Sequence, residues 1–102
     1  MASLRIEWNS NGESQSKVVT DDRPLLIGRH PRCDIVLSDP HVSRRHAAIF
    51  FNKRDFMLHN LSQTNPIIFN DMWQVPHGLR AAIEPGDNFE LGEIKMKVNL
   101  VM

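Results

Sequence analysis

Apolar and polar side chains alternate along several segments of this chain, and this alternation restricts the fold more than any other feature. Residues 4–8 read LRIEW and residues 94–100 read IKMKVNL, so every second side chain is apolar. Successive side chains of a strand point to opposite faces, so each segment would bury one face and expose the other. Sustained helical periodicity occurs nowhere, and turn residues interrupt the chain roughly every eight to twelve residues. The pattern predicts an all-β fold.

Clusters of turn-forming residues separate the predicted strands. They contain Gly, Pro, Asn, Asp or Ser, which supply turn geometry or bond to nearby backbone. The clusters are residues 9–12, 21–24, 38–40, 52–55 and 84–87. The strands predicted between them are residues 4–8, 16–20, 23–28, 35–37, 47–52, 55–60, 67–70, 72–75, 80–84, 88–92 and 94–100. Many short strands joined in this way are typical of a β-sandwich of two antiparallel or mixed sheets, whose functional loops gather at one end.

Length and charge restrict the classes of function. The chain has 102 residues, so we predict a single domain over residues 1–102. Its 12 basic and 12 acidic residues leave no basic excess, which argues against a nucleic-acid partner. Cys33 is the only cysteine, so no internal disulfide can form, and no apolar run approaches the length of a membrane span. We therefore predict a cytoplasmic protein without membrane insertion.

Three clusters of hydrogen-bond donors stand at the ends of predicted strands. They are Gly28-Arg29, the segment from Ser43 to His46 (SRRH), and the segment from Ser62 to Asn65 (SQTN). Arginine and hydroxyl side chains suit a tetrahedral oxyanion, because they donate several short hydrogen bonds to it. Taken singly, each cluster has an ordinary explanation as a turn or a solvated surface. Because the chain has no basic excess, any anion site that they form must be small.

In order and spacing these motifs resemble the forkhead-associated (FHA) family of phosphothreonine-binding domains. The family pattern is Gly-Arg, then Ser-x-x-His, then Thr-Asn-Gly, and this chain has Gly28-Arg29, Ser43 to His46 and Thr64-Asn65. Further similarity lies in the segments CDIVL (33–37), FN (69–70), GD (86–87) and LG (91–92), so the resemblance covers roughly residues 3 to 101. It implies an FHA-type β-sandwich of about eleven strands that grips a phosphothreonine in an extended peptide.

The resemblance assigns roles to five residues of the binding loops. Arg29 and Ser43 would donate to the phosphate, joined by Arg44. Thr64 would line the phosphothreonine pocket, and Asn65 would hydrogen-bond the peptide backbone. The implied partner is a phosphothreonine-containing protein or peptide, and the domain would act as a signalling or assembly adaptor within, or alongside, a larger signalling protein. No cofactor is expected.

Other residues would support the site or depart from the family pattern. Gly28 would be required because a side chain would crowd the turn, and the ring of His46 would tie the binding loops together. His41 is a candidate specificity contact to the bound peptide. Pro66 replaces the usual glycine and Gln63 replaces a frequent serine. Proline fixes φ, removes an amide donor and biases Asn65 toward an extended conformation.

Two other classes of function are weighed against peptide binding. Ser43 and His46 with a nearby aspartate lack the Gly-x-Ser-x-Gly context of a nucleophilic serine, so the chain is predicted not to be an enzyme. The spacing of the five histidines matches no compact zinc pattern, so no metal site is predicted. The alternative that stays open, because of Pro66, is a degenerate FHA-fold scaffold that binds its partner independently of phosphorylation.

Overall fold

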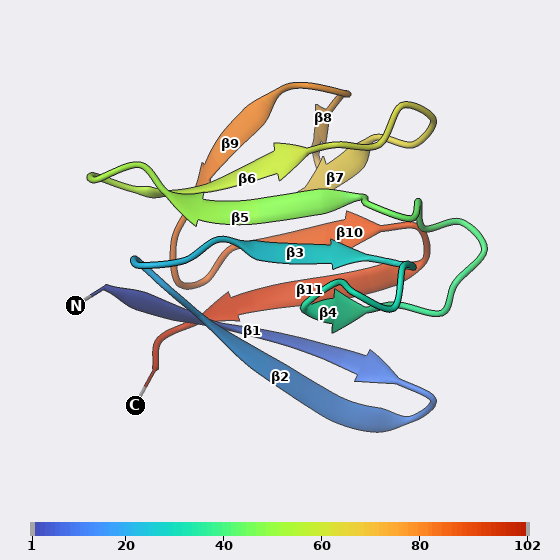
Figure 1. Ribbon diagram of the computed structural model, residues 1–102, viewed down its shortest axis with the longest axis horizontal. Helices are drawn as coiled ribbons and strands as arrows, with labels where there is room; N and C mark the ends of the chain where they lie inside the picture. The colour runs from blue at the N-terminus through green and yellow to red at the C-terminus, as the bar shows by residue number, and fades with distance from the viewer. Residues whose placement is uncertain (1, 102) are drawn as a thin grey trace.

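Short strands with polar turns make up almost the whole chain. A computed structural model describes residues 2–101 (Figure 1). Its strands are β1 (Ser3–Ser10), β2 (Glu13–Thr20), β3 (Leu25–Gly28), β4 (Ile35–Val36), β5 (Ala47–Phe51), β6 (Phe56–Asn60), β7 (Ile67–Phe69), β8 (Trp73–Val75), β9 (Arg80–Ile83), β10 (Asn88–Leu91) and β11 (Ile94–Asn99). Each lies at a predicted strand, and the all-β prediction is confirmed. Among the described residues, no helix has the length and hydropathy that crossing a membrane requires.

The strands form two sheets that pack face to face. One has six strands in the order β2-β1-β11-β10-β7-β8, and all of its pairings are antiparallel. The other has five strands in the order β4-β3-β5-β6-β9, in which β3 and β4 run parallel and the other pairs antiparallel. The predicted sandwich with a mixed sheet is therefore confirmed.

The core lies between the sheets and follows from the alternation in the sequence. In β11, Met96 and Val98 are buried while Lys95 and Lys97 are exposed. The fully or nearly fully buried apolar residues include Leu4, Ile6, Ile27, Ile35, Leu37, Val42, Ile49, Leu58, Ile67, Phe89, Leu91, Met96 and Val98. Such side chains each contribute about 1.5–3 kcal/mol by leaving water. Leu37 and Val42 belong to loops, so the core also anchors the connections on which the donor clusters stand.

The donor clusters meet at one end of the sandwich. In Figure 1 the connections β3–β4, β4–β5 and β6–β7 all lie at the right, where β3 and β6 end. The β5–β6 turn and the two ends of the described chain lie on the left, at the opposite end. Because antiparallel strands return the chain, loops that are distant in sequence converge at one edge.

The hairpin of β1 and β2 is exposed near its turn and buried at its base, where Leu4, Ile6 and Val19 join the core. Asn11 and Gly12 form its two-residue turn with φ of 53° and 80°, the left-handed values that a type I′ turn requires. β2 begins at Glu13, three residues before the predicted start at residue 16. The alternation is absent there because residues 13–18 are exposed on both faces. The tight turn and the pairing with β1 form this part of the strand.

Candidate functional site

Backbone hydrogen bonds join the end of β3 to the β4–β5 connection. The Arg29 N–H donates to the Ser43 carbonyl at 3.0 Å, and the His30 N–H donates to the Arg44 carbonyl at 3.1 Å. Gly28 lies against this second carbonyl: a Cβ at Gly28 would be 2.2 Å from the Arg44 oxygen and 2.8 Å from its carbon. A glycine is therefore required for the two donor clusters to lie side by side.

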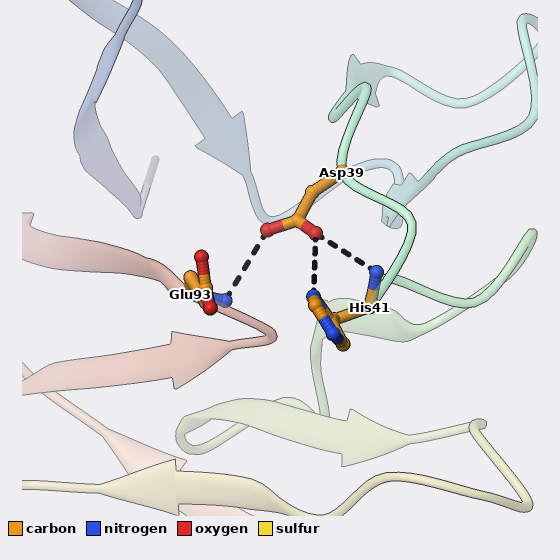
Figure 2. Close-up of side chains that lie close together, drawn as sticks. All are labelled: Asp39, His41 and Glu93. Atoms are coloured by element: carbon orange, nitrogen blue, oxygen red, sulfur yellow. Dashed lines mark hydrogen bonds and ion pairs between the residues drawn. The ribbon is translucent and has the colours of Figure 1, made fainter.

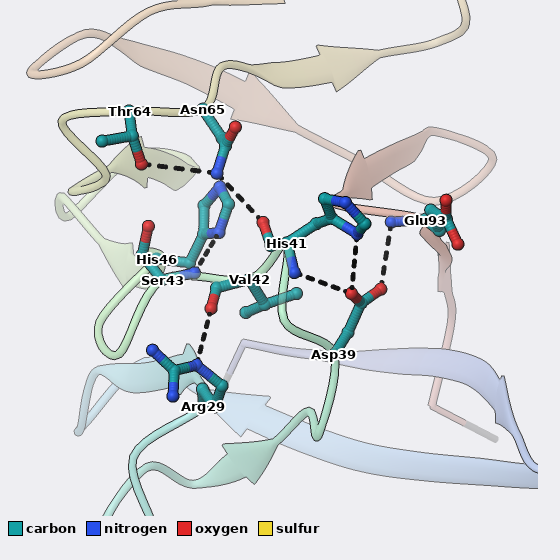
Figure 3. Close-up of polar contacts among 9 residues, drawn as sticks. All are labelled: Arg29, Asp39, His41, Val42, Ser43, His46, Thr64, Asn65 and Glu93. Atoms are coloured by element: carbon teal, nitrogen blue, oxygen red, sulfur yellow. Dashed lines mark hydrogen bonds and ion pairs between the residues drawn. The ribbon is translucent and has the colours of Figure 1, made fainter.

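The Arg29 side chain is held in place and keeps most of its donors. Its Nε donates to the Val42 carbonyl at 3.1 Å, directly before Ser43 in the chain (Figure 3). Within residues 2–101, neither Arg29 nor Arg44 forms an ion pair, and both side chains are exposed. A guanidinium carries five N–H donors in a fixed plane, so one bond to Val42 orients Arg29 and leaves its terminal nitrogens available for an anion.

The Ser43 hydroxyl lies 2.6 Å from the hydroxyl of Ser62. Ser62 is buried, and its Oγ accepts the Asn65 N–H at 3.1 Å and, more weakly, the Thr64 N–H at 3.4 Å. A hydroxyl oxygen has two lone pairs, and two backbone N–H groups already contact the Ser62 Oγ, so the arrangement favours donation from Ser62 to Ser43 over the more distant Thr64 hydroxyl at 3.5 Å. In that arrangement the Ser43 O–H is available to an external acceptor.

Asn60, at the end of β6, organises the β6–β7 connection from inside the protein. It is fully buried, and its Nδ2 donates to the Val75 carbonyl at 2.6 Å and the Asn65 carbonyl at 3.2 Å. Its Oδ1 accepts the Ser62 N–H at 2.8 Å. One side chain thus fixes both ends of the segment that carries Thr64 and Asn65.

Thr64 and Asn65 lie beside the β4–β5 connection. Thr64 is exposed, and Asn65 is half-buried. The Asn65 Nδ2 donates to the His41 carbonyl at 3.0 Å and to the Thr64 hydroxyl at 3.4 Å (Figure 3). The amide nitrogen of Asn65 is therefore engaged within the protein. No hydrogen-bond donor within the described residues contacts its Oδ1, so this oxygen is available to an external donor.

The ring of His46 occupies the interior beneath these loops. It has no exposed surface, and its Nδ1 accepts the Ser43 N–H at 3.1 Å. The ring is therefore in the tautomer that carries its hydrogen on Nε2. Nε2 has no hydrogen-bond partner within the described residues. Burial lowers the pKa of His46 below its ordinary value of 6.5, and the nearby Asn65 backbone only partly opposes this effect.

We expect His46 to make folding stability depend on pH. Because its pKa is lowered in the folded state, the unfolded chain binds more protons below about pH 6.5, and the free energy of unfolding falls as the pH decreases. The stabilisation is fully present above that pH. His46→Asn keeps an acceptor near the Nδ1 position but does not titrate, so its stability should fall less steeply between about pH 7 and 5. Urea unfolding of both proteins at several pH values measures this difference, and equal slopes would contradict the assignment.

Asp39 joins the β4–β5 connection to the β10–β11 turn (Figure 2). Its Oδ1 accepts the His41 N–H at 2.8 Å and lies 3.2 Å from the His41 Nδ1, while its Oδ2 accepts the Glu93 N–H at 3.3 Å. The His41 N–H, as the largest cause, lowers the pKa of Asp39. The ligand atoms of Asp39, His41 and Glu93 lie within 4.8 Å of one another, the arrangement among the described residues that resembles a metal site most. Because backbone N–H groups already occupy both Asp39 oxygens, we describe this cluster as a structural bracket.

The structure brings all three donor clusters together around Ser43. The Arg29 guanidinium is held beside Ser43, the Ser43 hydroxyl contacts that of Ser62, and Thr64 and Asn65 lie on the same side of this loop cluster. The exposed Arg44 follows Ser43 directly in the chain. Sequence reasoning missed two supports of this site, the buried Asn60 and the relay through Ser62. A signal for Asn60 was present, because it follows Phe56 and Leu58 on the inward face of β6, where the alternation calls for an apolar residue.

Comparison with known proteins finds relatives of the same architecture. The chain is 32% identical over 90 residues to the FHA domain-containing protein PS1 of Arabidopsis thaliana. The aligned region covers 81% of this chain and 6% of the plant protein. It is 28% identical over 81 residues to an oxoglutarate dehydrogenase inhibitor of Corynebacterium glutamicum, covering 79% of this chain and 54% of the inhibitor. The chain thus spans about half or less of these curated relatives.

A solved structure shows the same fold. An FHA domain studied for its phosphothreonine-dependent interactions superimposes with a TM-score of 0.81 at 23% identity and covers 99% of both chains. A family model described as the cytoplasmic domain of an inner membrane component of T3SS matches residues 10–101. With its eleven-stranded sandwich and converging loops, the chain therefore belongs to this family of FHA-type domains.

Proposed function

We propose that this domain binds phosphothreonine in a partner protein and acts as an adaptor. Arg29, Ser43 and Arg44 donate to the phosphate, Thr64 lines the pocket for the threonine methyl group, and the Asn65 Oδ1 accepts a peptide N–H. The observation that carries the proposal is the oriented guanidinium of Arg29, whose Nε donates to the Val42 carbonyl directly before Ser43. Unpaired donors on preformed loops are what an oxyanion site requires.

The energetics fit reversible recognition. A phosphothreonine carries about −1.5 to −2 charge at neutral pH and three acceptor oxygens. Each hydrogen bond to a charged group contributes about 1.5–3 kcal/mol. Desolvating the phosphate and ordering a flexible peptide offset part of this gain, so micromolar affinity is expected. One buried methyl group favours threonine over serine by up to about 0.8 kcal/mol.

The partner and setting follow from the same chemistry. The ligand is an extended phosphothreonine peptide of another protein, and the role is binding without catalysis. The structural neighbour with phosphothreonine-dependent interactions supports this assignment. The proposed compartment is the cytoplasm, consistent with a free, buried thiol at Cys33 and with the description of the matching family.

Fluorescence polarisation with degenerate peptide pools tests the proposal. The phosphothreonine pool should bind, the unphosphorylated pool should not, and the phosphoserine pool should bind a few-fold more weakly. Arg29→Ala should reduce phosphothreonine binding by about ten- to one-hundred-fold, because it removes a charge-assisted donor at the phosphate. Arg54→Ala is the matched control, since it deletes the same charge from an exposed residue in the β5–β6 turn at the opposite end.

The outcomes separate the two readings of the fold. Equal binding of phosphorylated and unphosphorylated pools, or equal losses in the two arginine variants, would contradict the phosphate site. Such a result would favour the scaffold that binds its partner independently of phosphorylation. One contact supports this alternative: the Asn65 amide, directly before Pro66, already donates to the His41 carbonyl within the protein.

A further inference from the structure

β2 leaves the outer edge of the six-stranded sheet unpaired. It is the first strand in the order of that sheet and pairs only with β1 (Figure 1, lower margin). Residues 13–18 are exposed on both faces, whereas Val19, nearer the end of the strand, is buried in the core. A strand edge of this length presents backbone N–H and C=O groups that another strand can bind.

The hairpin turn determines which backbone groups face outward. In a two-residue hairpin the residues next to the turn, here Ser10 and Glu13, form a hydrogen-bonded pair. Alternate residues of β2 after Glu13 therefore direct their N–H and C=O groups to β1, and the residues between them direct theirs to the free edge. The outward set is Ser14, Ser16 and Val18. Thr20, which has the same parity, forms a bridge to Arg23, and the free edge ends there.

The charged side chains along this edge would pair with those of an identical strand that runs antiparallel to it. Residues 13–17 read ESQSK, with Gln15 at the centre. If an identical strand lies antiparallel with Gln15 opposite Gln15, Glu13 faces Lys17 of the second copy, and Lys17 faces its Glu13. Ser14 then lies opposite Ser16, and both direct backbone groups to the partner strand. Backbone pairing and charge pairing therefore favour the same register.

Neighbouring registers do not satisfy both conditions. A shift by two residues places Lys17 opposite Gln15 or Asn11, and a shift by four residues places like charges opposite each other. Like charges directly opposite on paired strands are destabilising, whereas opposite charges contribute favourably. Lys17 on the free edge thus disfavours other registers and favours the one in which it faces Glu13.

We propose that two copies of this chain associate through β2 in this register, joining their six-stranded sheets into one. The segment that would pair, residues 13–17, is exposed in each copy, so its side chains are accessible to the partner strand. Because one short polar strand buries little area, the dimer is weak, with a dissociation constant in the micromolar to millimolar range. This association is independent of peptide binding at the loops.

Sedimentation velocity of charge-reversal variants, at protein concentrations from micromolar to millimolar, tests the proposal. The unaltered chain should show concentration-dependent dimerisation. Glu13→Lys and Lys17→Glu should each be monomeric, because each places like charges opposite one another. The double variant should dimerise again, and an equimolar mixture of the two single variants should form a heterodimer. Circular dichroism of each exposed-site variant verifies that the fold is retained.

A second variant tests the backbone contribution. Ser16→Pro removes an N–H that points to the free edge and should give a monomer, although the bonds of β2 to β1 stay intact. A chain that stays monomeric at all concentrations would overturn the proposal. So would self-association that single charge reversals leave unchanged, or a double variant that does not recover dimerisation.

Discussion

Replacing Asn60 by alanine should lower the free energy of unfolding by about 3–5 kcal/mol, because the carbonyls of Val75 and Asn65 and the N–H of Ser62 would lose their partner inside the protein. Urea denaturation measures the loss. The variant should also increase amide hydrogen exchange in the segment from Ser62 to Asn65, since Asn60 holds both of its ends.

Asn52 provides the matched control for this prediction. Its Oδ1 also accepts two backbone N–H groups, from Arg54 at 3.0 Å and Asp55 at 2.7 Å, but in an exposed turn at the other end of the sandwich. Water can replace those bonds, so Asn52→Ala should cost less than about 1 kcal/mol. Equal losses in the two variants would refute the claim that Asn60 acts as a buried brace.

Gly28→Ala should lower the free energy of unfolding by about 2–3 kcal/mol, because the new methyl group would overlap the Arg44 carbonyl and displace the β4–β5 connection. The displacement would break the alignment of Arg29 with Ser43, so phosphopeptide binding should fall together with stability. Calorimetry measures the loss of stability, and the NMR chemical shifts of Arg44 and Arg45 report the displacement of the β4–β5 connection. Fluorescence polarisation measures the loss of phosphopeptide binding.

Gly12→Ala is the control for Gly28→Ala. It replaces a glycine without creating an overlap between the new methyl group and another part of the protein. No atom lies within 4 Å of a Cβ at Gly12, although its φ of 80° strains any other residue. This variant should therefore lose some stability but keep peptide binding. Retained binding in Gly28→Ala would show that the β4–β5 connection does not depend on close approach at that glycine.

The strands could be predicted from the sequence because alternation directly reflects burial on one face of a sheet. Met96 and Val98 face the core between exposed lysines, as their spacing predicts. The first half of β2 was not predicted, because a strand exposed on both faces has no alternation to detect. The order of strands was also out of reach, since the placement of β11 between β1 and β10 depends on contacts distant in sequence.

The residues of the candidate site were easier to predict than the roles of their atoms. The resemblance to FHA domains names Arg29 and Ser43 as candidate residues, and the structure joins them through the bond from the Arg29 N–H to the Ser43 carbonyl. The sequence could not indicate that the Ser43 hydroxyl lies against that of Ser62, because these residues are 19 positions apart in the chain. Nor could it indicate that Asn65 would direct its amide to the His41 carbonyl, a contact between two loops.

The two ends of the described chain lie at the opposite end of the sandwich from the β4–β5 connection that carries Ser43 (Figure 1). A fluorophore, an affinity tag or a tether to a sensor chip can therefore be attached at either terminus without shielding the loops. An immobilised domain would present these loops to the flowing solution, and two such domains joined by a linker between their ends would face outward in different directions.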